Sequence, residues 1–185
     1  MKRSRGYKDD MTSVSTMRMG FLDTEDRLLM DFVYSDHTMS MLGTRRIIRR
    51  ALQGIAQVLA QSSPVIARVP ATHKTEVLVW EHLSALQLDG GHAGGGGDQA
   101  PPGHSTPPWQ VLVKLDINTQ PTSFALRFEG RGGAVVDMTM SRPELHRLLA
   151  SLRQLARHAE WDLDTEIGWL IEADAPQMRP GNLLS

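Results

Sequence analysis

Two pairs of titratable side chains stand close enough along the chain to suggest acid–base chemistry. Asp137 falls near the end of an expected strand and His146 one turn into the helix expected after it, while His158 and Glu160 stand near that helix's end. A carboxylate beside an imidazole can pass a proton to or from a substrate. No nucleophile elbow, metal-spaced triad or phosphate loop accompanies either pair, so we expect a protein that is not an enzyme and has no catalytic residues.

A basic cluster offers a different chemistry. Four arginines fall on one expected helix, where they could bind phosphate or an acidic partner: Arg45, Arg46, Arg49 and Arg50. The alternative function is therefore a nucleic-acid-binding or anionic-lipid-binding protein that uses this helix face. However, 20 basic and 21 acidic residues leave a net charge of −1, and no aromatic residues interleave the arginines. A solvated helix face is the plainer interpretation, and nucleic acid is not a favoured partner.

The residue types argue against metals and cofactors. There are no cysteines, which excludes disulfides and cysteine-ligated zinc. His92 and His104 lie in the segment DGGHAGGGGDQAPPGHSTPP, where a glycine-rich chain holds ligands poorly. Its GGGG is not followed by Lys-Ser/Thr and is not framed by a strand and a helix, as a phosphate-binding loop would be. We expect no metal site and no cofactor.

The composition fits one or two small domains in 185 residues, 41% of them apolar. No apolar run approaches the length of a membrane span, and the basic start lacks the apolar stretch of a signal peptide. We expect an α+β protein with a helical N-terminal region, a flexible linker and a C-terminal β–β–β–α dimerisation unit. The expected divisions are a mobile basic arm over 1–20, a mainly helical domain over 21–88, a Gly/Pro-rich linker over 89–107, the β–β–β–α unit over 108–162 and a tail over 163–185.

The N-terminal half is expected to form helices. The acids and threonine of residues 23–26 resemble a helix start, and the apolar residues after them, Leu28, Leu29, Phe32 and Val33, have helical spacing. Thr44 opens a second helix that stops at Ser63-Pro64. Residues 72–88 fit a strand or a helix, and the length favours a helix.

The C-terminal unit opens with the stretch WQVLVKLDI. Its alternation places Trp109, Val111, Val113, Leu115 and Ile117 on one face, with Leu112 as the exception. Two further alternating stretches, 122–128 and 134–140, are separated by a glycine-rich turn, which predicts an antiparallel meander. Ser141 and Glu144 match a capping box that opens a helix with a continuous leucine stripe. Three strands and one helix cannot close a large core alone, so we expect a dimer in which each copy covers the other's apolar face.

These C-terminal motifs resemble the COMM domain over residues 109–158. The shared features are a Trp-x-Val first strand, the proline-led strand PTSFALRFEG, and a third strand that runs into Ser-x-x-Glu-Leu and a leucine-rich helix. The resemblance implies a non-enzymatic adaptor or assembly subunit that pairs with itself or with other COMM-domain-like proteins. It further implies a role in endosomal trafficking or in ubiquitin- and NF-κB-linked regulation, and a cytoplasmic location, with endosomes or the nucleus as further possibilities.

The resemblance also implies an interface, for which an ordinary core within the chain is the alternative. The expected interface residues are Trp109, Val111, Val113, Pro121, Leu126, Phe128, Leu145, Leu148, Leu149 and Leu152.

Overall fold

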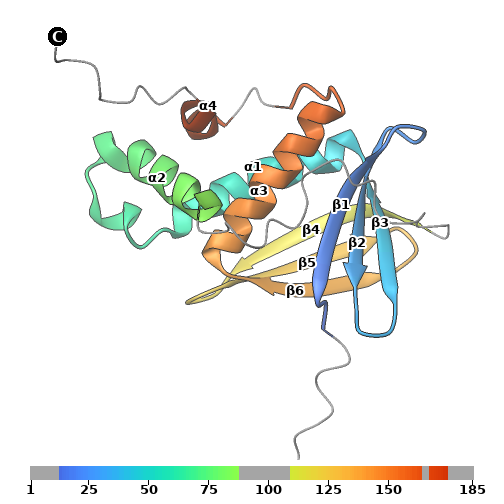
Figure 1. The fold of residues 1–185 in the computed structure, drawn as a ribbon. Coiled ribbons are helices and arrows are strands. Elements are labelled where there is room, and N and C mark those ends of the chain that lie inside the picture. Colours follow the sequence, from blue (N-terminus) through green and yellow to red (C-terminus); the bar gives the residue numbers. More distant parts are fainter. Residues whose placement is uncertain (1–12, 88–108, 164–166, 175–185) are drawn as a thin grey trace, which may run out of the picture.

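The structure is a computed structural model that describes residues 13–87, 109–163 and 167–174. The expected linker over 89–107 lies outside the described residues, as do most of the expected basic arm and most of the expected tail. Within the described residues, three strands and two helices are followed by three more strands and two more helices, with two short 3₁₀ turns before the second helix (Figure 1).

All six strands belong to one sheet, in the order β1-β2-β3-β4-β5-β6. The strands are β1 (Thr16–Leu22), β2 (Arg27–Val33), β3 (Thr38–Gly43), β4 (Gln110–Thr119), β5 (Phe124–Gly130) and β6 (Val135–Met140). Each group of three is an antiparallel meander, and β3 joins β4 in parallel through a short contact. The sheet is strongly coiled, so that β1–β3 run across β4–β6 (Figure 1).

The expected fold class is wrong, because the N-terminal region contains strands where helices were expected. The acids of residues 23–26 form the turn between β1 and β2, and Asp26 takes a left-handed conformation with φ of 48°. The apolar residues after it belong to β2, whose residues Leu28 to Phe32 are all buried. A strand that is buried on both faces shows no alternation, so its apolar run fits a helix equally well.

The helices expected after Thr44 are present. The four helices are α1 (Arg45–Ser62), α2 (Lys74–Gln87), α3 (Arg142–His158) and α4 (Gly168–Asp174). The Thr44 hydroxyl accepts a hydrogen bond from the Ile47 amide and so caps α1, which ends at the expected Ser63. The ambiguous stretch 72–88 is helical over α2, as its length favoured. The Ser141–Glu144 capping box opens α3 as expected.

The strands and helix expected after residue 108 are also found, although they do not form a separate unit. Their main departure is a β-bulge at Val113, where the register between β4 and β5 shifts. The bulge turns Leu112 into the core and leaves Val113 46% exposed, which reverses the face expected for these two residues.

The core lies where the two halves of the chain meet. Phe32 of β2 and Phe128 of β5 are fully buried, and their ring centroids are 4.9 Å apart. Helices α1 and α3 pack together antiparallel over this contact: the guanidinium of Arg45, at the start of α1, lies 5.6 Å from the ring centre of Trp161, just beyond α3. In turn, Arg142 at the start of α3 donates to the Leu59 carbonyl near the end of α1. Each half therefore covers the other.

We expect Phe128→Ala to lower the free energy of unfolding by about 3–5 kcal/mol, because it removes one side of the central ring contact and leaves a cavity. Urea unfolding followed by circular dichroism measures the change. Val113→Ala is the matched control, since Val113 is 46% exposed, and we expect a change within about 0.5 kcal/mol. An equal loss in the two variants would contradict a core shared by the two halves.

The capping box gives a pH-dependent prediction. Hydrogen bonds from the Ser141 hydroxyl and amide hold the pKa of Glu144 below its usual range. A lowered pKa stabilises the fold above the unfolded value of about 4.3, and this contribution disappears as the pH falls through the folded pKa. Ser141→Ala should cost about 1 kcal/mol at pH 7, and the difference from wild type should shrink as the pH falls below about 4. Thermal melts from pH 3 to 7 test this, and a pH-independent difference would contradict it.

Candidate functional site

A pocket of about 460 Å³ opens between α2 and the start of α3. We call it the helix pocket, and its lining residues are Val65, Val77, Trp80, Glu81, Ser84, Ala85, Arg142, Pro143 and His146. Two local features of the sequence bring these residues together. The capping box fixes where α3 starts, and Ser63 ends α1 so that the chain turns into α2.

The rim of the helix pocket is apolar and open to solvent. The side chain of Trp80 is 66% exposed and that of Val65 is 50% exposed, although both are large and hydrophobic. On the other side of α2, Leu78 and His82 are buried. An exposed tryptophan beside a pocket is typical of a surface that binds a partner, because tryptophan is over-represented among residues that dominate binding energy.

The floor of the helix pocket is an ion pair that also ties three helices together. Arg142 donates from Nε and Nη2 to one carboxylate oxygen of Glu81, at 3.0 and 2.7 Å. It also donates to the Ser62 hydroxyl and to the Leu59 carbonyl, which lie in the last turn of α1. The other Glu81 oxygen accepts from the Ser63 hydroxyl. Arg142 therefore connects the last turn of α1 to α2 as well as to its own helix, α3.

Beside this ion pair lies a buried histidine. His146 is 1% exposed, and its Nδ1 lies 3.2 Å from Nδ1 of His82. Its Nε2 has no hydrogen-bond partner and lies 4.0 Å from Glu81 Oε2. Burial, then His82, then Arg142 lower the pKa of His146 to about 3, so the ring is neutral near pH 7. A buried polar atom without a partner costs about 1–3 kcal/mol, which makes it a point where a ligand group would be favoured.

The tautomer of His146 follows from its neighbours. Because both rings present Nδ1 to each other, one of these nitrogens carries a hydrogen and the other accepts it. If His82 donates, His146 carries its hydrogen on Nε2, which faces the Glu81 carboxylate favourably. If His146 donates, its Nε2 lone pair faces the same carboxylate. The first arrangement is electrostatically preferred, so we assign Nε2 as a donor.

The structure does not bring together the first acid–base pair considered from the sequence. Asp137 lies on the exposed face of β6, where it accepts two hydrogen bonds from Arg127, at 2.8 and 2.9 Å, whereas His146 lies in the helix pocket. His158 and Glu160 are both exposed at the end of α3, and Glu160 takes a φ of 52° as the helix ends. Groups of three metal-ligating side chains are absent from the described residues.

The arginine cluster lies at the start of α1, and all four of its side chains are exposed. Arg45 stacks on Trp161, and the Trp161 indole donates to Asp26. The first turn of α1 contains no acidic residue. The cluster therefore leaves the start of the helix strongly positive.

Most residues of the expected interface are buried by the chain itself. Those below 6% exposure are Leu126, Phe128, Leu145, Leu148, Leu149 and Leu152. Trp109 and Val111 are partly buried, whereas Pro121 and Val113 are exposed. Sequence reasoning did not single out Glu81, His82 or Arg142 as site residues. His82 could have been noticed from its spacing, because it lies four residues after Leu78 and three before Ala85, as a residue on the buried face of a helix does.

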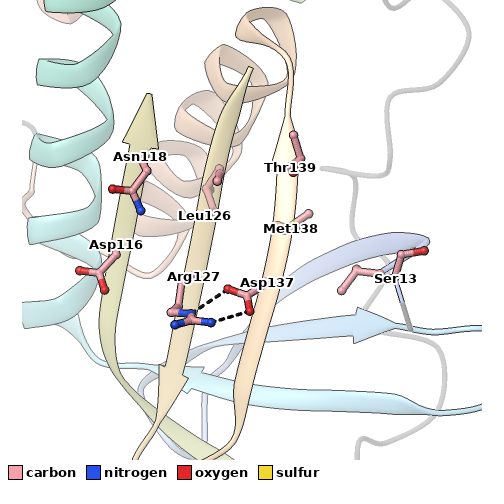
Figure 2. A pocket seen from close by; sticks show the side chains of 10 residues that line it. Ser13, Asp116, Asn118, Leu126, Arg127, Asp137, Met138 and Thr139 are labelled. Carbon is pink, nitrogen blue, oxygen red and sulfur yellow. Dashed lines mark hydrogen bonds and ion pairs between the residues drawn. The ribbon is translucent and has the colours of Figure 1, made fainter. Parts of the chain in front are cut away.

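A second hollow, of about 630 Å³, lies on the sheet (Figure 2). We call it the seam, because it runs between β6 and the residues that lead into β1. Its lining residues are Ser13, Val14, Asp116, Asn118, Ala125, Leu126, Arg127, Asp137, Met138 and Thr139. Figure 2 shows the Arg127–Asp137 ion pair across β5 and β6, with Asp116 on β4 beside it. The seam is thus polar, in contrast to the helix pocket.

Comparisons with known proteins return no match: no family model, no curated protein and no solved structure is similar to the chain. The COMM-domain resemblance therefore stays a prediction. Among the described helices, none combines the length and the apolar character that a membrane span requires.

The Glu81–Arg142 pair gives a stability prediction. Each side chain is 20% exposed, so removing one partner leaves the other poorly solvated. We expect Glu81→Gln and Arg142→Met each to cost about 2 kcal/mol, and the double variant to cost clearly less than the sum. A double-mutant cycle by urea unfolding measures the coupling. Additive single costs would show that the pair does not act as a unit.

Proposed function

We propose that this chain is a non-enzymatic binding protein, an adaptor or assembly subunit, that holds a segment of a partner polypeptide in the helix pocket. The observation that carries the proposal is a buried, unpartnered donor, His146 Nε2, in an open pocket whose rim exposes Trp80. The apolar rim favours a bulky apolar side chain. The donor favours an oxygen acceptor next to that side chain.

The charges of the pocket narrow the partner's chemistry. Glu81 and Arg142 neutralise each other, and the arginine also donates hydrogen bonds to the Leu59 carbonyl and the Ser62 hydroxyl. A charged group in the pocket would have no free counter-charge and would lose its hydration. A neutral main-chain carbonyl beside a leucine-like side chain satisfies both the rim and His146. The partner segment is therefore an internal stretch of a polypeptide and not a free carboxyl end.

No feature of the helix pocket supports catalysis. The low pKa of His146 makes it a poor base near pH 7, since it would hold a proton only in strong acid. Glu81 is held by Arg142 and Ser63. The pocket therefore fits binding better than turnover.

A model ligand tests the proposal directly. N-acetyl-leucine methylamide carries an apolar side chain between neutral carbonyls, whereas N-acetyl-leucine ends in a carboxylate. We expect the methylamide to shift the Nε2 resonance of His146 in nitrogen-15 NMR and to change Trp80 fluorescence, with the acid binding about tenfold more weakly or worse. Equal binding of both compounds, or no change at His146 with the methylamide, would overturn the assignment.

Variants of α2 then test the rim. Trp80→Ala should weaken methylamide binding by about tenfold or more, because it removes the main apolar contact. Leu86→Ala is the matched control, since Leu86 is 40% exposed on the same helix but does not line the pocket. Circular dichroism melts should show that both variants keep the wild-type stability. If Leu86→Ala weakens binding as much as Trp80→Ala, the helix pocket is not the binding site.

A further inference from the structure

The two halves of the chain are structural repeats of one β–β–β–α unit. Thr44 and Ser141 cap the helices that follow β3 and β6, so they mark equivalent positions. Counting back along the strand pairs from these caps makes Phe32 equivalent to Phe128. These two equivalent rings touch each other at 4.9 Å, as residues beside a two-fold axis do.

The helices support the same relation. Arg142, at the start of α3, contacts the end of α1. In the equivalent contact, Arg45 at the start of α1 lies over Trp161, which follows the end of α3. Similarly, α1 packs on β4 while α3 packs on β1. An approximate two-fold relation between the units accounts for each of these paired contacts.

This relation predicts a second strand junction. In the first, β3 pairs in parallel with β4 through Met41 with Gln110 and Leu42 with Val111. In the second unit, Met138 and Thr139 are equivalent to Met41 and Leu42. When the bulge at Val113 is counted as one inserted residue, Ser13 and Val14 are equivalent to Gln110 and Val111. The second junction would therefore pair Met138 with Ser13 and Thr139 with Val14. These four equivalent residues are all in the lining of the seam. Among the described residues, no ladder joins β6 to β1.

The seam is therefore the place where the sheet would close if the second junction formed. Within the described part of the chain, β6 pairs with β5 alone, so the other main-chain edge of Asp137, Met138 and Thr139 has no partner strand there. Figure 2 shows Asp137, Met138 and Thr139 on β6, with Ser13 on the side away from β5. A free strand edge is a template for another strand, because its amides and carbonyls have no partners within the sheet. The first junction shows that the repeat unit accepts a parallel strand at this position.

We propose that the seam binds an extended segment of a partner polypeptide, which pairs with β6 as an added strand. The charges select its chemistry. The seam is lined by two acids, Asp116 and Asp137, which form ion pairs with Lys114 and Arg127. Lys114 also pairs with Glu129, so this group contains three acids and two bases and keeps a net negative charge. An extended segment with lysine or arginine between small apolar residues matches this surface, because alternate side chains of a strand face the sheet's polar surface. This site is independent of the helix pocket.

The test uses the full chain with two capped peptides, acetyl-VKVKV-amide and acetyl-VEVEV-amide. We expect the basic peptide to protect amides of residues 135–140 from hydrogen exchange and to bind about tenfold more tightly than the acidic one. Asp116→Asn combined with Asp137→Asn should remove most of that preference. Equal protection by both peptides, or no protection of β6 at millimolar peptide, would overturn the proposal.

A reversible block distinguishes the seam from a general strand edge. The chain has no cysteine, so Val14→Cys with Thr139→Cys introduces a single pair across the seam. We expect the oxidised variant to lose binding of the basic peptide by about tenfold or more and to regain it on reduction. Undiminished binding by a fully oxidised sample would overturn the proposal. A variant without residues 1–12 should keep wild-type affinity, and a large gain would instead assign the seam to the chain's own first residues.

Discussion

Neither β–β–β–α unit has enough secondary structure to bury its own apolar face, and the contact between the units meets that need. Phe32 and Phe128 meet at the centre, and the leucines of α3 and the apolar stripe of α1 close over them. Because the packing is mutual, the position of each helix start is fixed by the other unit. The helix pocket depends on this constraint, since Arg142 can reach Glu81 only where α3 begins against the end of α1.

The same constraint explains what the sequence predicted well and what it did not. The alternation in residues 109–140 and the Ser141–Glu144 capping box are local signals, and the corresponding strands and helix are present. The size argument, that three strands and one helix need a second copy, is sound as physics. However, the covering copy found in the structure is the chain's own N-terminal unit, which the helical spacing of Leu28, Leu29 and Phe32 had concealed.

That concealment has a physical cause. Strand β2 is buried on both faces, so its residues lack the polar–apolar alternation by which a half-buried strand is recognised. The methionines on either side do alternate, at Met17 and Met19 and at Met39 and Met41, and they pair with β2. The internal repeat was hidden as well, because equivalent polar pairs differ in type: Ser40 donates to Asp31 in the first unit, whereas Arg127 pairs with Asp137 in the second.

The two candidate sites could not be predicted because each arises from a departure from the repeat. The helix pocket forms beside α2, which has no counterpart of equal length among the described residues after α3. There His146 is buried next to the Glu81–Arg142 ion pair. The seam forms where one of two equivalent strand junctions stays open. A repeated fold satisfies its own contacts wherever its halves match, so unmet hydrogen bonds and exposed apolar groups concentrate where they do not match. Binding capacity in this chain is therefore expected at the breaks in its internal symmetry, and both hollows lie at such breaks.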